Sequence, residues 1–144
     1  MYVTDILNAK GTEVIATGPT ETVAVTARLL NDRRIGAVLV RDGEDNVIGV
    51  ISERDIIRGI AVNGADALDM EVRDLMTSEV VSCKLTDTIS EVMRVMTTRR
   101  FRHLPVMEDG TLKGMISIGD VVKYRLEETE TEARALRDYV IASR

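Results

Sequence analysis

The chain contains one sequence pattern twice, and this internal repeat limits its possible folds more than any other feature. Residues 11–40 read GTEVIATGPTETVAVTARLLNDRRIGAVLV, and residues 77–106 read TSEVVSCKLTDTISEVMRVMTTRRFRHLPV. Each copy then ends alike, with GVISERD at 49–55 and GMISIGD at 114–120. A long repeat present only twice excludes solenoids and propellers and predicts two copies of one supersecondary unit packed together. We therefore expect the functional site between the halves.

Length and composition indicate a globular chain with one substantial core. It has 144 residues, of which 44% are hydrophobic, enough for a single compact domain or two small packed ones. The net charge of −5 and aromatic content of 3% argue against nucleic acid and anionic membranes as partners. Apolar runs such as 37–40 fall far short of the roughly 20 residues that span a bilayer. No signal peptide is recognisable, so we expect a cytoplasmic protein.

The cysteine and histidine content argues against metal and redox chemistry. Cys83 is the single cysteine and His103 the single histidine, so neither an internal disulfide nor a four-ligand zinc site is expected. Cys83 lies in an apolar segment, where a buried thiol is more common than a reactive one. We expect no metal site and no catalytic cofactor.

Each repeat begins with a predicted strand and an amphipathic helix. The apolar stretches 14–17 and 80–83 precede Thr20 and Thr86, which are suited to cap a helix. Apolar residues then recur at helical spacing. They are Val23, Ala27 and Leu30 in the first copy, and Ile89, Val92, Met93 and Met96 in the second.

Two short strands and a second helix complete each repeat. Asp-Gly turn sequences at 42–43 and 109–110 lie between apolar runs, which predicts β-hairpins. The predicted hairpin strands are 37–40 with 47–51 and 104–107 with 112–116. A helix is expected to open at Ser52 in one copy and at Ser117 in the other. The repeat unit is thus β-α-β-β-α, and the fold class is α/β (α+β).

These elements predict where the repeats begin and end. We assign residues 1–65 to the first repeat, 66–126 to the second and 127–144 to a C-terminal helical tail. The pattern of residues 72–76 resembles that of residues 3–7, so the first residues are expected to belong to repeat one.

The tail has the spacing of a helix that packs along another helix. Intervals of four and three separate Val122, Leu126, Thr129, Ala133, Leu136 and Val140. The intervening glutamates form an acidic face. Two heptads do not distinguish a tail that pairs with a second copy from one that folds back on its own chain.

Asp55 and Asp120 are the sharpest candidates for ligand binding. Each follows a serine, Ser52 or Ser117, by three residues. A carboxylate can accept hydrogen bonds from both hydroxyls of a ribose. The same Ser-x-x-Asp spacing also resembles a helix capping box. Both interpretations remain open, because an uncapped helix N-terminus is itself an anion site.

Taken together, these motifs resemble a tandem pair of cystathionine β-synthase (CBS) domains. Asp-Leu-Met-Thr at 74–77, His-Leu-Pro-Val at 103–106 and the Gly-x-x-Ser-x-x-Asp ends carry the resemblance, which extends from about Val3 to about Leu126. It implies two repeats packed as a pseudo-twofold pair, usually within a homodimer. It also implies a regulatory module that binds AMP, ADP, ATP, NAD(H) or S-adenosylmethionine in clefts between the repeats and acts on a partner protein that the sequence does not identify.

The resemblance implies two sets of ligand-binding residues. The main cleft would be lined by Lys10, Thr12, Ile15, Ala16, Ile35, Gly36, Ala37, Arg102, His103, Ile116, Ser117 and Asp120. A second and weaker cleft would be lined by Ser52, Asp55, Ser78, Val81 and Ser82. The second lacks basic residues where the first has Arg102 and His103, because Gly36 and Ala37 occupy the matching positions.

Several residues of the main cleft also have structural interpretations. Gly36 would admit a purine close to the backbone or allow close strand packing. His103 would contact phosphate or serve only as a structural group. Lys10 would bind phosphate or remain a solvated surface lysine. The glycine that follows Lys10 leaves room for a ligand longer than AMP, which keeps NAD(H) among the candidates.

Two functions therefore stay open from the sequence, and a third is excluded. The first is a nucleotide-sensing regulatory module, and the second is a ligand-free module for dimerisation and protein interaction. An enzyme is not expected, because no nucleophile–base arrangement or phosphate-binding loop is present and His103 is the only imidazole.

Overall fold

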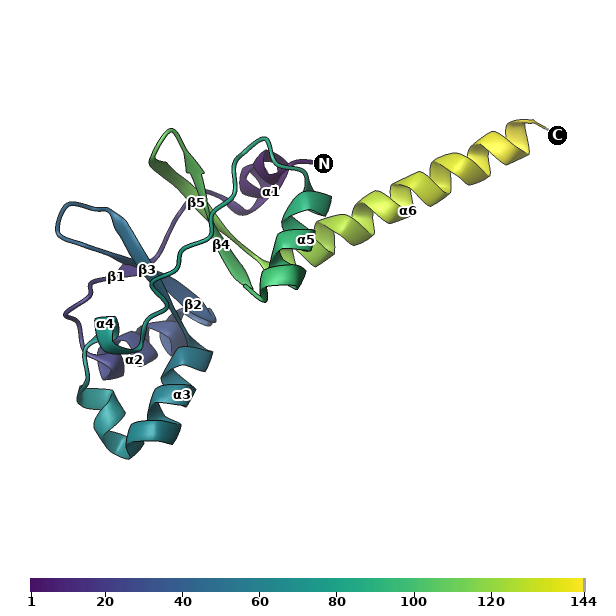
Figure 1. Ribbon diagram of the computed structural model, residues 1–144. Coiled ribbons are helices and arrows are strands. Elements are labelled where there is room, and N and C mark those ends of the chain that lie inside the picture. The colour runs from purple at the N-terminus through teal and green to yellow at the C-terminus, as the bar shows by residue number, and fades with distance from the viewer. Residues whose placement is uncertain (144) are drawn as a thin grey trace. The chain divides into compact units, whose positions relative to one another are not determined.

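The computed structural model describes residues 1–143 and divides into two compact units (Figure 1). The terminal unit consists of Met1–Glu13 and Val81–Arg144, and the middle unit is Val14–Val80. Arg144, the last residue of the predicted tail, lies outside the described residues. Both units mix helices and strands, as the repeat predicted.

The middle unit has a three-stranded sheet with helices around it. In chain order its elements are β1 (Ala16–Thr17), α2 (Val23–Arg33), β2 (Ala37–Arg41), β3 (Val47–Ser52), α3 (Glu53–Asn63), the 3-10 helix η1 (Gly64–Asp69) and α4 (Val72–Leu75). The strand order is β1-β2-β3, with β1 parallel to β2 and β2 antiparallel to β3. The predicted first hairpin is confirmed, and Ala37 pairs with Ser52.

The terminal unit repeats this plan with fewer strand contacts. Its elements are α1 (Val3–Lys10), α5 (Ile89–Arg99), β4 (His103–Glu108), β5 (Thr111–Ser117) and α6 (Ile118–Ala142). The antiparallel β4–β5 pair confirms the second hairpin, in which His103 pairs with Ser117.

Two details of the sequence prediction are wrong. The helix caps are Thr22 and Thr88, whose hydroxyls accept from the amides of Val25 and Glu91, and not Thr20 and Thr86. The true caps stand directly before the first buried residue of each helix, Val23 and Ile89, where the first turn needs an acceptor.

Residues 80–83 do not form the predicted strand. Only Cys83 reaches β4, through an isolated bridge to Val106. Its amide donates to the Pro105 carbonyl at 3.0 Å, and its carbonyl accepts from the Met107 amide at 2.9 Å.

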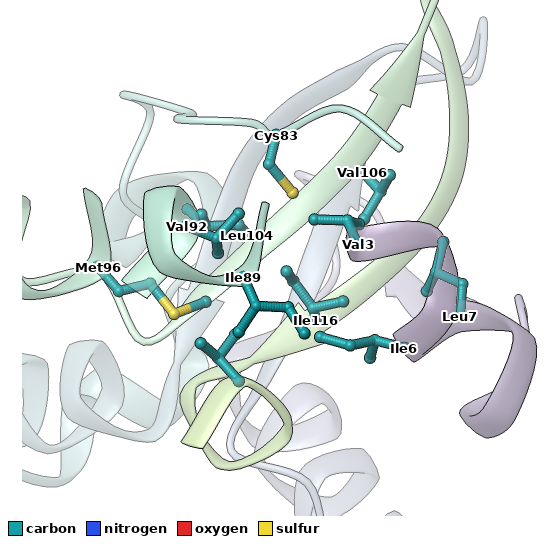
Figure 2. Packing of buried hydrophobic residues seen from close by; sticks show 11 residues of the cluster. Val3, Ile6, Leu7, Cys83, Ile89, Val92, Met96, Leu104, Val106 and Ile116 are labelled. Carbon is teal, nitrogen blue, oxygen red and sulfur yellow. The ribbon is translucent and has the colours of Figure 1, made fainter. Parts of the chain in front are cut away.

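Helix α1 packs in the terminal unit, with the second repeat, although its sequence pattern places it with the first. Val3, Ile6 and Leu7 join a buried cluster with residues of α5, β4 and β5 (Figure 2). The amide of Val3 also donates to the Asp87 carbonyl at 2.9 Å. Helix α1 packs against the elements that cover its apolar face, and these belong to the second repeat. The compact units therefore do not follow the order of the repeats. The predicted boundaries at 65 and 126 remain predictions about the sequence.

A glycine in each hairpin makes room for a helix. A Cβ atom on Gly114 of β5 would lie 2.8 Å from Leu7 Cδ2, and one on Gly49 of β3 would lie 2.6 Å from Met76 Sδ. A side chain at either glycine would therefore require the facing leucine or methionine side chain to move. Met76 therefore serves the middle unit as Leu7 serves the terminal unit, which explains why residues 3–7 and 72–76 resemble each other.

The predicted helical tail is confirmed as part of α6, which runs without interruption from Ile118 to Ala142. Every residue from Thr129 to Ser143 is exposed. Among residues 1–143, no helix combines the length and apolar character needed to cross a membrane.

We predict that Ile6→Ala destabilises the protein strongly. Ile6 is fully buried, and removing a buried isoleucine side chain costs about 2–5 kcal/mol of unfolding free energy. Asn8→Ala, at an exposed position of the same helix, should change it by less than about 0.5 kcal/mol. Urea unfolding measures both values. Equal effects of the two substitutions would show that α1 does not contribute to the core.

Candidate functional site

The start of α6 carries the main candidate site, and its geometry first confirms the capping interpretation. Strand β5 ends at Ser117, whose Oγ accepts from the Asp120 amide at 3.2 Å. In return, Asp120 Oδ2 accepts from the Ser117 amide at 2.9 Å. This reciprocal pair is a capping box. It holds the Asp120 carboxylate beside the positive end of the helix dipole.

Lys10 completes an ion pair at this carboxylate. Its ammonium donates to Asp120 Oδ2 at 2.8 Å and to the Met115 carbonyl at 3.0 Å. The side chains of Lys10 and Asp120 remain 39% and 24% exposed. Lys10 is therefore exposed and ion-paired with Asp120, and its predicted role in binding phosphate stays a prediction. A charged pair at a helix start that stays open to solvent can exchange its partners for those of a ligand.

The electrostatics of the site keep Asp120 ionised. Partial burial acts to raise the pKa of Asp120, but hydrogen bonds from Lys10 and Ser117 and the charge of Lys10 outweigh it and lower the pKa below its ordinary value. The carboxylate is thus available as a hydrogen-bond acceptor at neutral pH.

Arg102 and His103 lie beside the same helix start through backbone contacts. The Arg102 carbonyl accepts from the Ile118 amide at 2.8 Å, and His103 pairs with Ser117 across the hairpin. Arg102 is exposed and His103 half-buried. Ile116, by contrast, is fully buried in the hydrophobic core, so it supports the strand from within. Thr12, also in this unit, is exposed.

The equivalent aspartate of the middle unit is in a different environment. Asp55 is only 6% exposed. Its Oδ2 accepts from the Ser52 amide at 2.9 Å and the Ser52 hydroxyl at 3.1 Å. Its Oδ1 accepts from the Thr77 hydroxyl at 3.3 Å and from Arg58 at 3.4 Å. Four donors from its own unit therefore bind this carboxylate.

Sequence reasoning missed Thr77 as a partner of Asp55. Two backbone hydrogen bonds of 2.9 Å between Thr77 and Val50 hold Thr77 against β3. Its position at the end of the Asp-Leu-Met-Thr motif could have indicated a role for Thr77. The contact joins the first turn of α3 to a residue beyond α4, however, so only the folded structure reveals it.

Backbone contacts in the middle unit match those around Arg102 and His103. The Gly36 carbonyl accepts from the Glu53 amide at 2.9 Å, as the Arg102 carbonyl does from Ile118. Ala37 pairs with Ser52 as His103 pairs with Ser117. The predicted equivalence of these positions is therefore present in the geometry.

The predicted main-cleft residues fall into two sets. Lys10, Thr12, Arg102, His103, Ile116, Ser117 and Asp120 belong to the terminal unit, and Ile15, Ala16, Ile35, Gly36 and Ala37 belong to the middle unit. In the first set the structure brings Lys10, Ser117 and Asp120 into direct contact. A cleft that joins both sets stays a prediction.

The predicted second-cleft residues are also divided. Ser52, Asp55 and Ser78 belong to the middle unit, and Val81 and Ser82 to the terminal unit. Ser52 and Asp55 are in direct contact, and Ser78 and Ser82 are exposed. Their assembly into one site likewise stays a prediction.

An open hollow of about 550 Å³ lies in the middle unit, and Asp55 is not among the residues that line it. It is lined by residues of α2, the start of α3 and the segment between α2 and β2, including Leu30, Ile35, Gly36 and Ile57. Ile57 is 65% exposed. The lining also includes the polar and charged residues Asn31, Arg34 and Glu53. Ile35 and Gly36 of the predicted main cleft therefore lie at this hollow.

Cys83 is a free and buried cysteine within residues 1–143, the part of the chain that the structure describes. No group of three His, Cys, Asp or Glu side chains there could hold a metal ion. Burial, with a smaller contribution from the charge of Asp87, raises the pKa of the Cys83 thiol to about 12. A buried protonated thiol is a poor nucleophile.

The repeated unit, the capping boxes and the paired hairpins have a counterpart among known proteins. The CBS-domain family model matches residues 3–62 and 72–127, and the chain therefore belongs to the CBS-domain family. Solved structures of other family members share the fold. A CBS-domain protein of Agrobacterium tumefaciens, ATU1752, superposes with a TM-score of 0.84 at 44% identity over 86% of this chain and 92% of its own.

Two further comparisons indicate the range of the family. The mitochondrial CBS domain-containing protein CBSX3 of Arabidopsis thaliana is 35% identical over 83% of this chain, which spans 60% of that relative's length. The CBS domain pair of protein MJ0100, solved in complex with 5′-methylthioadenosine and S-adenosyl-L-methionine, has a TM-score of 0.78 at 19% identity over 89% of this chain and 98% of its own. The last likeness establishes the fold alone.

We predict that Lys10→Met raises the pKa of Asp120. The substitution removes the ammonium that helps to lower this pKa, whereas Lys113→Met, at an exposed position of β5, should leave it unchanged. Carboxyl NMR titration measures the pKa in each variant. An unchanged pKa in Lys10→Met would show that the ion pair does not form in solution.

The same ion pair has a defined pH dependence. Because the folded-state pKa of Asp120 is lowered, its stabilising contribution is present above the unfolded value of about 3.9 and is lost as the pH falls through the folded value. Lys10→Met should therefore have a lower free energy of unfolding than the wild type at neutral pH. This difference should become smaller as the pH falls below about 4.

Proposed function

We propose that the chain is a regulatory module that binds an adenosine nucleotide, namely AMP, ADP, ATP or NAD(H), at the start of α6. The observation that carries the proposal is the partly exposed Asp120–Lys10 pair at the capped end of that helix. A carboxylate there suits the two hydroxyls of a ribose, and an ammonium and helix amides suit a phosphate. MJ0100, which has the same fold, binds two adenosine compounds, which supports this ligand class.

The charges at the site favour anionic ligands. The Lys10 ammonium lies 2.8 Å from Asp120 Oδ2. Arg102 directly precedes His103, which pairs with Ser117 across the hairpin. A nucleotide would place its ribose hydroxyls on Asp120 and its phosphates near these cations. The sulfonium of S-adenosylmethionine would bring a third positive charge to the same place, so we rank it below the nucleotides.

In this proposal the Asp120 carboxylate exchanges partners when the ligand arrives. Ribose hydroxyls donate to the carboxylate, and the Lys10 ammonium turns from Asp120 toward the phosphate. The capping bonds of Ser117 remain, so the helix start stays in place. His103, Thr12 and the middle-unit residues Ile15, Ala16, Ile35, Gly36 and Ala37 would complete the main cleft.

The second cleft is the weaker one in this proposal. The Asp55 carboxylate is buried and already accepts four hydrogen bonds. A ribose there would have to displace Thr77 or Arg58, whereas the Asp120 site requires only the exposed Lys10 to move. Ser52, Asp55, Ser78, Val81 and Ser82 would then bind a second ligand only at higher concentration.

A ligand-free dimerisation module is the second candidate function. The complete capping boxes at Ser52 and Ser117 favour it, because they give both aspartates a structural role without any ligand. In either case we propose a homodimer that acts on another protein without catalysing a reaction. A cytoplasmic location stays a prediction.

We predict that AMP, ADP, ATP or NAD(H) raises the melting temperature and that Asp120→Asn removes most of the shift. At a ligand concentration 100 times Kd, binding adds about 2.7 kcal/mol to the unfolding free energy. Asparagine keeps a side-chain acceptor for the cap but loses the charge. Asp55→Asn is the matched variant of the other repeat and should preserve the main shift.

Thermal shift assays followed by calorimetry separate the two functions. A shift that is abolished by Asp120→Asn and retained by Asp55→Asn supports nucleotide sensing through the main cleft. If none of these nucleotides, nor S-adenosylmethionine, gives a shift or measurable heat, the ligand-free module is the correct function.

A further inference from the structure

The last half of α6 is a helix that packs against nothing in its own unit. Glu128 is the last half-buried residue, and it accepts from the Met1 ammonium at 2.6 Å. Beyond it every residue to Ser143 is exposed. A solitary helical segment of about 14 residues is marginal in water, since most helices are stabilised by packing of an apolar face. The segment therefore needs a partner.

One face of α6 from Val122 to Val140 is apolar and has the spacing of a coiled-coil seam. Leu126, Leu136 and Val140 on this face are 59%, 65% and 46% exposed. With Val122, Thr129 and Ala133 they occupy successive a and d positions, with Leu126, Ala133 and Val140 at a. Exposed leucines at this spacing are a surface for a second helix.

The helix cannot supply that partner by folding back. It is continuous from Ile118 to Ala142, and the sequence after Gly119 contains neither glycine nor proline to break it. A second copy of the chain can supply the partner helix.

The charges beside the seam favour a second copy in parallel orientation. Arg125 and Glu132 occupy g positions, and Glu130 and Arg137 occupy e positions. In a parallel pair each g residue faces the e residue five positions later in the other chain. Arg125 then meets Glu130 of the second copy, and Glu132 meets Arg137 of the second copy. Both contacts join opposite charges, and twofold symmetry repeats them.

An antiparallel pair with the same apolar layers brings like charges together. Val122 would face Val140, and Leu126 would face Leu136. Glu130 would then lie near Glu130 of the other chain and Glu132 near Glu132. Like charges at facing positions destabilise the pair, so this orientation is disfavoured.

Existing contacts of these residues leave the interhelical pairs possible. Arg125 donates to Glu128 of its own helix at 3.2 Å, but a guanidinium has five N–H donors and can serve a second carboxylate. Within residues 1–143, Glu130, Glu132 and Arg137 form no ion pair of their own.

We propose that residues 122–142 of α6 form a parallel two-stranded coiled coil with the same residues of a second copy. The small side chains of Thr129 and Ala133 at its centre bury little apolar surface, so the coiled coil is weak. We expect it to dissociate within the concentration range of sedimentation equilibrium. The proposal does not depend on nucleotide binding, because all its residues lie beyond the Asp120 site.

The first test is a charge exchange in the full-length chain, followed by sedimentation equilibrium. We expect Glu132→Arg and Arg137→Glu each to raise the dimer Kd by about 4- to 30-fold, since two attractive pairs become repulsive. The double variant Glu132→Arg/Arg137→Glu should restore the wild-type Kd. Both substituted positions are exposed, so folding should not be affected. An unchanged Kd in both single variants would refute the proposal.

The second test determines the orientation by cross-linking. In a parallel pair two cysteines at Val140→Cys lie side by side, whereas in an antiparallel pair they are about 27 Å apart. We expect Val140→Cys to form an intermolecular disulfide under mild oxidation, and Arg134→Cys, at an outward-facing position, to form far less. Native Cys83 is buried, 4% exposed, and should not contribute. Equal cross-linking of the two variants, or none, would overturn the parallel coiled coil.

Discussion

The docking of α1 onto the β4–β5 hairpin is the interaction on which the terminal unit depends. A two-stranded hairpin is marginally stable in water by itself and needs a covering layer. Helix α5 and the first turns of α6 supply part of that layer, and Val3, Ile6 and Leu7 supply the rest. The first and last parts of the chain are therefore joined in one core, and Gly114 leaves the space that Leu7 fills.

This docking also builds the candidate site. Lys10 is the last residue of α1, so the packing of Val3, Ile6 and Leu7 places its ammonium at the start of α6. The Asp55 site has no such lysine, because the helix that plays the role of α1 there is α4, which ends at Leu75. Thr77, just beyond that helix, binds Asp55 instead. One motif thus forms an open charged pair in one unit and a buried, fully bonded carboxylate in the other.

The sequence predicted those parts of the fold whose signals are local. Both hairpins follow from Asp-Gly turns between apolar runs, and the helices that open at Ser52 and Ser117 follow from the capping boxes. The capping threonines were misplaced by two residues, because each segment offers two threonines and only the position of the first buried residue selects between them. The packing of α1 with the second repeat could not be predicted from residues 3–7, because an apolar helix face does not indicate which sheet it packs against. The contact between Thr77 and Asp55 has the same origin in tertiary structure.

Helix α6 connects the two functional parts that we propose. Its first turn holds Asp120, and its last turns carry the seam for a second copy. A nucleotide would shift the dimer equilibrium only if it bound the paired and unpaired forms with different affinity. An uninterrupted helix transmits a change of direction at its first turn to its far end. A small rotation at the first turn would therefore move Leu136 and Val140 toward or away from the same residues of the second copy. In our proposal Lys10 would link the two, because its partner would change from Asp120 to the ligand while α1 stays packed against the same hairpin. Any coupling between nucleotide and dimer would therefore arise where α1 meets the start of α6.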